Sequence, residues 1–295
     1  MATRFEIVLP GEDESRLRAA GEEALAEIER LDTQLSLYQA DSEITWINAR
    51  AAKSAVKVEP RLFRLLERCA ELTRLTDGAF DITIAPLMLA WGFVGGSGRM
   101  PKDSDVEKAR EAVGMHHVLL DADSFTARFD REDVTLDLGA VGKGYAIERA
   151  VGILRECGVT SGLIHGGTST VYGIGAQPDG KPWKIAIRNP AKPDSHLDVV
   201  ELRDSALSVS AVRGKSFIAD GTEFGHVIDP RTGRPVAGAL AAAVIGPSPT
   251  DCDALSTALL VLDEPGISLL GERFPGYEEL VAVPSTEGVR IIRGT

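Results

Sequence analysis

The pattern of hydrophobic and polar positions predicts helices through the first half of the chain. Apolar residues recur there every three or four positions, which is the spacing of one face of a helix. Residues 5–9 are predicted to form an opening strand. The predicted helices cover residues 11–32, a short segment capped by Asp41 or Ser42, residues 62–76 and 105–113, and a segment through Ile147 and Leu154 that ends at Gly158.

Strands dominate the second half. Trp183, Ile185 and Ile187 alternate with other residues, as in a half-buried strand. Because helices gather in one half and strands in the other, the sequence favours α+β architecture over alternating βαβ winding. We expect one α+β domain over residues 1–295, with room for two lobes. The further predicted strands are residues 163–168, 199–202, 206–210, 224–228 and 241–245, with a closing hairpin at 280–283 and 289–292.

A glycine-rich stretch carries the first chemical signal. It runs Asp137-Leu-Gly-Ala-Val-Gly-Lys-Gly-Tyr145, after a predicted strand at residues 134–137 and before a predicted helix. Its glycines can aim backbone amides at the helix N-terminus, and Lys143 adds a positive charge, which together suit an anion. The spacing differs from the phosphate loop of nucleotide triphosphatases and from the dinucleotide fingerprint. A purely structural turn therefore explains the stretch equally well.

Composition limits the partners. A formal net charge of −12 and an isoelectric point near 5.0 argue against nucleic acid or an anionic membrane as the main partner. Cys69, Cys157 and Cys252 are scattered and indicate neither a disulfide framework nor a zinc site. No apolar run is long enough for a signal peptide or a membrane span. We expect a cytoplasmic protein, or one from which a leader has been removed.

A second motif is His226-Val-Ile-Asp-Pro-Arg-Thr-Gly-Arg-Pro235. A tight turn at residues 229–233 explains its Asp, Pro and Gly residues without any function. It does not explain His226, which strand alternation would place on the same face as Ile228. Two interpretations of His226 stay open, a core histidine and a general base. The adjacent His116 and His117 are more consistent with a loop or a strand edge than with a metal site.

A third motif is Asp251-Cys-Asp-Ala-Leu-Ser-Thr-Ala-Leu-Leu260. If it opens a helix, Asp253 and Thr257 lie one turn apart on one face, and their oxygen atoms suit Mg²⁺. The alternative is an acidic helix start favoured by the helix dipole. Because a residue near a helix start is rarely central to a core, we expect Asp253 to lie outside it.

The three motifs, in this order, resemble the ApbE-type FAD:protein FMN transferases. The resemblance extends to the blocks Met1-Ala-Thr3, Leu35-Ser-Leu-Tyr38 with Ser42-Glu-Ile and Asn48, and Thr76-Asp-Gly-Ala-Phe-Asp81, so it covers residue 1 to about residue 260. One departure follows Gly166-Gly167, where Thr168 stands in place of the family's usual acidic or amide residue. This departure concerns the local contacts with substrate.

The resemblance implies a function and a set of site residues. It implies Mg²⁺-dependent transfer of FMN from FAD to a threonine or serine hydroxyl of a target protein, with release of AMP. His226 would take the proton of that hydroxyl. Two alternatives are an Mg²⁺-dependent FAD pyrophosphatase that gives FMN and AMP, and a flavin-binding protein without turnover. By the resemblance, FAD would be contacted by Met1, Tyr38, Ala79, Phe80, Asp81, Asp137 and Lys143, and the metal by the carbonyl of Ala140, Asp253 and Thr257.

Overall fold

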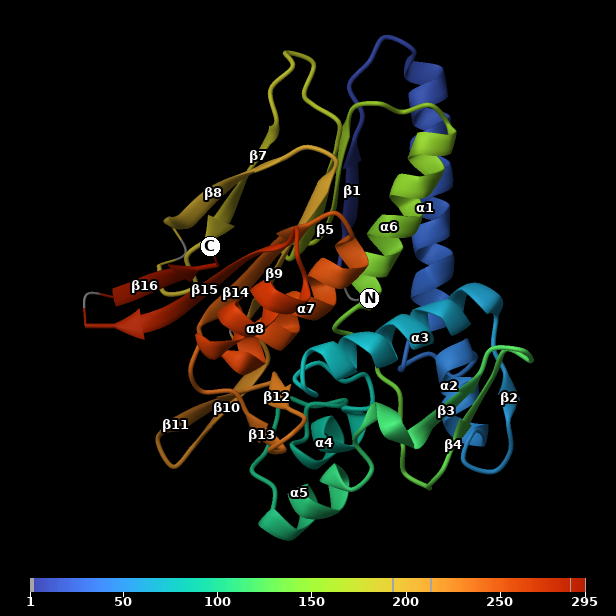
Figure 1. The fold of residues 1–295 in the computed structure, drawn as a ribbon, viewed down its shortest axis with the longest axis vertical. Helices are drawn as coiled ribbons and strands as arrows, with labels where there is room; N and C mark the ends of the chain where they lie inside the picture. Colours follow the sequence, from blue (N-terminus) through green and yellow to red (C-terminus); the bar gives the residue numbers. More distant parts are fainter. Residues whose placement is uncertain (1–2, 193, 213, 287, 295) are drawn as a thin grey trace. The chain divides into compact units, whose positions relative to one another are not determined.

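The chain folds into two compact units. The structure is a computed structural model that describes residues 3–192, 194–212, 214–286 and 288–294. The first unit combines residues 1–33, 140–211 and 239–295, and the second combines residues 34–139 and 212–238 (Figure 1). Each unit is therefore built from segments that are far apart in the sequence.

The first unit is built on an antiparallel sheet, which has seven strands within the described residues (Figure 1). The register of β6 with β9 places Thr170 opposite Ser208, and that of β9 with β14 places Ser210 opposite Ala242. In order across the sheet, the strands are β1 Phe5–Val8, β5 Gly162–Gly166, β6 Thr170–Ile174, β9 Ser205–Ala211, β14 Ala241–Gly246, β15 Glu278–Ser285 and β16 Gly288–Arg293.

Helices cover one face of this sheet. Helix α6 (Gly142–Glu156) packs on β5 and β6, and α7 (Pro249–Leu262) packs on β9 and β14 (Figure 1). Helix α1 (Glu14–Leu35) contacts α6, and α8 (Pro265–Arg273) follows α7. The other face is covered by the hairpin of β7 (Trp183–Arg188) and β8 (His196–Leu202), whose apolar residues form one buried cluster with those of β6, β9, β14 and β15.

Within the described residues, the second unit holds the remaining helices and three small sheets. Its apolar core includes Trp91 and Phe93, and the Trp91 indole N–H donates to the Gly233 carbonyl at 2.8 Å. The helices are α2 Glu43–Arg50, α3 Pro60–Leu75, α4 Ala85–Ala90, α5 Asp103–Arg110 and the 3₁₀ helix η1 Met115–His117. The strands are β2 Val56–Lys57, β3 Val118–Asp121, β4 Thr126–Phe129, β10 Ser216–Ala219, β11 Thr222–Gly225, β12 Ile228–Asp229 and β13 Arg234–Pro235.

Most of the predicted elements are confirmed. Helices α1, α3 and α6 lie where the apolar spacing predicts them, Ser42 caps α2, and β15 pairs with β16 as the closing hairpin. The α+β class is confirmed by an antiparallel sheet with helices on one face. The five predicted core residues of α1 are all buried: Leu17, Ala20, Ala24, Ile28 and Leu31.

Two predicted strands are wrong. Residues 134–137 belong to no sheet, because the side-chain amide of Asn48 takes both backbone hydrogen bonds of Leu136 in the place of a neighbouring strand. The predicted strand at residues 224–228 is broken. β11 ends at Gly225, β12 begins at Ile228, and His226 lies in the bend between them.

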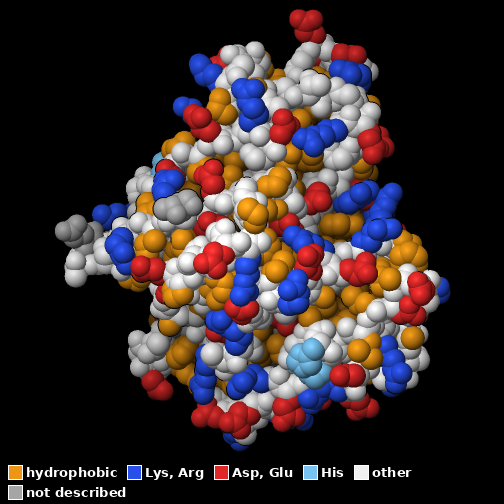
Figure 2. All heavy atoms as spheres, in the orientation of Figure 1, with side chains coloured by type: hydrophobic (Ala, Val, Ile, Leu, Met, Phe, Trp, Pro, Cys, Tyr) orange, Lys and Arg blue, Asp and Glu red, His pale blue; other side chains and the backbone are white. Residues whose placement is uncertain are grey.

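Charges of both signs are mixed on one face of the molecule. On the face drawn in Figure 2, acidic and basic side chains are interspersed. Within the described ranges, no helix has the length and the apolar character needed to cross a membrane.

Candidate functional site

Asp253 is buried where the first turns of α6 and α7 meet. It is the fifth residue of α7, a helix that begins at Pro249 and is capped by Ser248, whose hydroxyl accepts a hydrogen bond from Asp251 N. Asp253 is only 2% exposed. The expectation that it lies outside the core is therefore wrong, because the start of α7 is itself packed against α6 and the sheet.

The Asp253 carboxylate is held by four donors from the described residues. The backbone N–H of Gly144 donates to Oδ2 at 2.9 Å, and Lys143 Nζ lies 3.4 Å from Oδ1. The hydroxyls of Thr170 and Ser208 each donate to Oδ1 at 3.2 Å. A buried carboxylate is costly unless it is paired and hydrogen-bonded, and this one has both kinds of partner.

The glycine stretch serves close packing as well as turning. A Cβ at Gly144 would overlap the carbonyl oxygen of Pro249 and lie 2.7 Å from the Cβ of Asp253. Two of the amides in this stretch meet carboxylates of the chain, since Gly144 N donates to Asp253 and Gly139 N donates to Asp137 Oδ1 at 2.8 Å.

The oxygen atoms around Asp253 fit a hard cation. Thr257 Oγ1 lies 3.3 Å from the carbonyl oxygen of Asp253, to which it can donate. The N–H of Gly144, the ordinary helical partner of the Ala140 carbonyl, donates to Asp253 instead. Within the described part of the chain, no three His, Cys, Asp or Glu side chains group as metal ligands. One carboxylate with hydroxyl and carbonyl oxygens suits Mg²⁺, which keeps waters and takes phosphate oxygens from a ligand.

Asp81 is the corresponding buried aspartate of the second unit. Its Oδ1 accepts hydrogen bonds from Thr83 N at 2.8 Å and from the Thr83 hydroxyl at 2.6 Å, and its Oδ2 accepts from Met115 N at 3.0 Å. The Thr83 hydroxyl in turn accepts from Gly114 N at 2.6 Å. Burial raises the pKa of the Asp81 carboxyl, and these hydrogen bonds oppose the rise. Asp81 thus ties the end of the Thr76–Asp81 block to η1.

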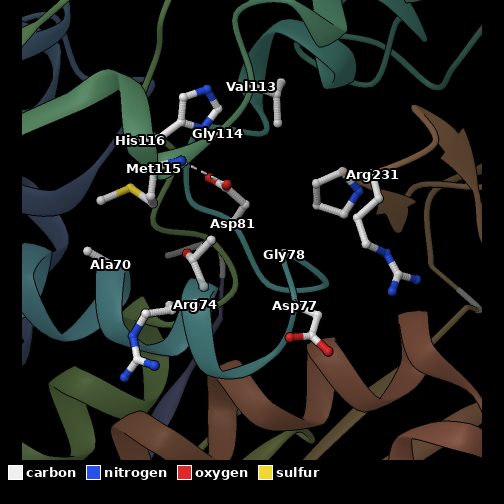
Figure 3. Close-up of a pocket in the computed structure, with 12 residues that line it drawn as sticks. Ala70, Arg74, Asp77, Gly78, Asp81, Val113, Gly114, Met115, His116 and Arg231 are labelled. Carbon is white, nitrogen blue, oxygen red and sulfur yellow. Dashed lines mark hydrogen bonds between the residues drawn. The ribbon is translucent and has the colours of Figure 1, made fainter.

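A pocket of about 530 Å³ opens beside Asp81 within the second unit (Figure 3). Figure 3 shows Arg74 of α3 and Arg231 of the β12–β13 turn on opposite sides, with Asp77 and Asp81 between them. The Arg231 guanidinium is paired with Asp229 at 2.9 Å, and this pairing raises the pKa of Arg231. The pocket therefore mixes charges of both signs, and Asp81 is the predicted flavin contact that lines it.

The other predicted flavin contacts differ in exposure. Tyr38 is 67% exposed, and partial burial of its hydroxyl, together with the negative charge of Asp137, raises the pKa of Tyr38. Burial likewise raises the pKa of Asp137, against the hydrogen bond from Gly139 N. The side chains of Ala79 and Phe80 are buried in the core of the second unit, which leaves only their backbone for a ligand. Met1 lies outside the described residues.

His226 packs against an aromatic ring. Its ring centroid lies 6.4 Å from that of Phe93, with the two planes at 71°. A side chain added at Gly214 would lie 2.8 Å from the His226 ring, so the bend also packs tightly against that glycine. The following turn is confirmed, since Gly233 N donates to the Asp229 carbonyl at 2.8 Å and Gly233 has a φ of +71°.

The sequence analysis missed the hydroxyls around Asp253. Thr170, Ser208, Ser210 and Ser256 all lie within hydrogen-bond distance of another group at this centre. The sequence indicates only some of these hydroxyls. Ser208 and Ser210 are polar residues two positions apart on one face of a strand, whereas only tertiary packing brings Thr170 and Ser256 beside them.

Comparisons with known proteins agree on one family. The sequence model of the ApbE family matches residues 1–281. The chain is 28% identical to the FAD:protein FMN transferase of Vibrio cholerae serotype O1 over 243 residues, or 80% of this chain and 71% of that protein. It is also 28% identical over 268 residues to the FAD:protein FMN transferase of Escherichia coli K12, covering 89% of this chain and 76% of the relative.

Solved structures share the fold. The ApbE protein of Thermotoga maritima superposes with a TM-score of 0.90 at 29% identity, and the match covers 99% of this chain and 94% of that one. The flavinyl transferase ApbE of Pseudomonas stutzeri, in its apo form, gives a TM-score of 0.85 at 30% identity and covers 99% and 95%.

Proposed function

The chain belongs to the ApbE family, and from this membership we propose that it is an enzyme that transfers flavin from FAD to another protein. The curated relatives that match most of its length carry the name FAD:protein FMN transferase. The observation that carries the proposal furthest is the buried Asp253, held beside Lys143 and one turn from Thr257. In a protein of net charge −12, this centre concentrates what a diphosphate needs, a cationic side chain and ligands for a metal.

In this proposal the residues divide into three roles. His226 acts as the general base, and Asp253, Thr257 and the carbonyl of Ala140 hold Mg²⁺. Lys143 pairs with a phosphate oxygen of the bound flavin nucleotide. The remaining proposed contacts of FAD are Met1, Tyr38, Ala79, Phe80, Asp81 and Asp137, with Ala79 and Phe80 acting through their backbone.

The reaction is a substitution at phosphorus. The hydroxyl oxygen of a threonine or serine on the target protein forms a bond to the FMN phosphorus, the bond from that phosphorus to the bridging oxygen breaks, and AMP leaves with that oxygen. His226 accepts the hydroxyl proton as the new bond forms. Bound Mg²⁺ would neutralise the charge that develops on the AMP leaving group. Lys143 adds a fixed positive charge for the same purpose.

A transfer assay tests the proposal. The protein is incubated with FAD and Mg²⁺ in a cell extract, and the products are separated on a denaturing gel that is read by flavin fluorescence. We expect covalently fluorescent protein and one AMP for each flavin transferred, and neither product in excess chelator. Free FMN with AMP but no labelled protein would replace the transferase with an FAD pyrophosphatase. Unchanged FAD would leave a flavin-binding protein.

The same assay tests the role of His226. A general base acts on the attacking hydroxyl in the transition state and contributes little to binding of FAD in the ground state. The His226→Ala variant should therefore lose transfer rate by roughly 10²- to 10⁴-fold and keep its affinity for FAD. Equal losses of FAD affinity and of rate would make His226 a ligand or a packing residue of the Phe93 cluster.

A further inference from the structure

A chain of hydroxyls links the two side chains that the proposed function assigns to the cation. At one end, Ser208 donates to Asp253 Oδ1 at 3.2 Å, and Ser256 Oγ lies 3.4 Å from Ser208 Oγ. Ser210 Oγ lies 2.9 Å from Ser256 Oγ and 3.1 Å from Thr257 Oγ1 at the other end. The path therefore runs from a carboxylate oxygen to a threonine hydroxyl without leaving the described hydroxyl groups.

The fold dictates this arrangement. Ser208 and Ser210 alternate along β9, so both point to the sheet face on which α7 packs. Ser256 and Thr257 follow Asp253 by three and four residues, which places them one helical turn further along α7. Thr170 on β6 is opposite Ser208, and its hydroxyl lies 3.0 Å from Ser208 Oγ and 3.2 Å from Asp253 Oδ1.

The hydrogen bond from Ser208 to Asp253 Oδ1 gives the chain a direction. A carboxylate can only accept hydrogen bonds, whereas each hydroxyl has a single proton to donate. Ser256 and Thr257 each have a second acceptor, the carbonyl oxygen of Asp253, at 3.0 and 3.3 Å. When each hydroxyl donates along the chain instead, Thr257 donates to Ser210, Ser210 to Ser256, Ser256 to Ser208, and Ser208 to Asp253. In this arrangement the Thr257 proton points toward Ser210. The lone pairs of Thr257 Oγ1 are then free of that proton and can face a cation.

We propose that Ser208, Ser256 and Ser210 are positioning residues, which fix the Asp253 carboxylate and orient the Thr257 hydroxyl so that the pair selects Mg²⁺ over Ca²⁺. This inference rests on the proposed cation site. Mg²⁺ requires nearly ideal octahedral geometry at about 2.0–2.1 Å, whereas Ca²⁺ accepts longer and more variable distances. Loosening the ligands therefore weakens Mg²⁺ binding more than Ca²⁺ binding.

The Ser210→Ala variant tests this role. Loss of the Ser210 hydroxyl interrupts the chain but leaves Ser256 and Thr257 the carbonyl oxygen of Asp253 as an acceptor, at 3.0 and 3.3 Å, so the fold is retained. The measurement uses the full-length, FAD-free protein. Mn²⁺ is bound and followed by electron paramagnetic resonance, and Mg²⁺ or Ca²⁺ is then added to displace it. Thermal unfolding without metal reports the stability of each variant.

The expected result is a change in selectivity. Ser210→Ala should weaken displacement by Mg²⁺ about tenfold and displacement by Ca²⁺ by less than about threefold, because groups that hold metal ligands typically contribute 10- to 100-fold to affinity. Ser210→Thr, which keeps the hydroxyl, should restore the wild-type ratio. The matched control is Ser205→Ala on the same strand, since Ser205 Oγ accepts from Arg203 N and is outside the hydroxyl chain.

Three outcomes contradict the inference in different ways. If wild-type protein binds no Mn²⁺, the proposed cation site fails and the inference fails with it. If it binds Mn²⁺ but Ser210→Ala has the wild-type affinities, the hydroxyl chain does not position the ligands, although the cation site stands. If Mg²⁺ and Ca²⁺ binding fall by the same factor, or if Ser205→Ala falls equally, Ser210 has only a structural role.

Discussion

Each unit contains a buried aspartate, and the two are held by different kinds of donor. Asp81 in the second unit receives the N–H and hydroxyl of Thr83, two residues away, and one backbone N–H of η1. Asp253 in the first unit receives donors from three other elements, namely the start of α6, β6 and β9, and one of them is the charged Lys143. Both aspartates are buried, with exposed fractions of 8% for Asp81 and 2% for Asp253, but their hydrogen-bond donors differ in kind.

The difference separates a carboxylate that fixes a turn from a candidate metal ligand. Backbone N–H groups and a close neighbour in sequence fix Asp81 into a turn, and its bonds close that turn against Met115. The donors of Asp253 include hydroxyls, which rotate, and a lysine, which can turn to another anion. Asp253 can thus exchange a donor for a cation without leaving its place in the fold.

Replacing each aspartate by asparagine should separate the two roles. Asp253→Asn keeps the size of the side chain but removes its charge, so the proposed metal loses its carboxylate and transfer should fall about 10³-fold, or several kcal/mol. Asp81→Asn places an amide group near Met115 N, and we expect it to lower the free energy of unfolding by about 2 kcal/mol. Its transfer rate at saturating FAD should remain within about tenfold of wild type.

These variants are compared by rate, FAD affinity and urea unfolding. If Asp253→Asn keeps its Mg²⁺-dependent transfer, Asp253 is not the carboxylate ligand of the metal, and the distinction between the two aspartates fails. It also breaks down if Asp81→Asn loses metal binding while its stability is unchanged.

Two glycines of α6 test how closely the helix backbone packs against Asp253. Gly144→Ala should push α6 away from Pro249 and Asp253, at a cost of about 3 kcal/mol in the free energy of unfolding, because the added Cβ has no room. Gly152→Ala is the matched control on the same helix, since nothing lies within 4 Å of its added Cβ. It should stabilise the protein by about 0.5–1 kcal/mol through helix propensity. Chemical denaturation measures both, and equal effects would mean that the contact of α6 with α7 is not tight.

The sequence predicts the elements whose signal is local. The apolar stripes of α1 and α3 repeat over several turns, and the closing hairpin alternates on both sides of a turn, so burial follows from spacing alone. The failure at residues 134–137 has a nonlocal cause. Alternate burial of Val134, Leu136 and Leu138 is that of a strand, but Asn48 supplies the hydrogen bonds from a distant part of the chain.

The candidate site also has a part that the sequence predicts and a part that depends on tertiary packing. The resemblance selects Asp253, Thr257 and Lys143, and the structure brings these three to one place in the first unit. Nothing in the local sequence indicates that Asp253 is buried, because its burial depends on Gly144 and on how closely α6 approaches α7. The hydroxyl of Thr170 is hidden for the same reason, since its role depends on its register with Ser208.

Another buried carboxyl, Glu279 of β15, extends the comparison to a side chain with few donors. Glu279 is 4% exposed, and its Oε1 has no hydrogen-bond partner among the described residues. Burial raises the pKa of Glu279 to about 7, and the neighbouring Glu278 adds to the rise. Where Asp253 is compensated by donors, Glu279 is expected to take up a proton instead.

The protonation of Glu279 makes stability depend on pH. A folded-state pKa of about 7, above the ordinary 4.5, means that the folded protein holds the proton more tightly than the unfolded chain. The stabilisation is fully present below pH 4.5 and is lost as the pH rises through 7. Glu279→Gln stays neutral, so it should match wild type at pH 5 and exceed it at pH 8 by on the order of 2 kcal/mol in the free energy of unfolding. Urea unfolding at both pH values measures this. A constant difference between Glu279→Gln and wild type from pH 5 to 8 would show that Glu279 ionises like a solvated glutamate.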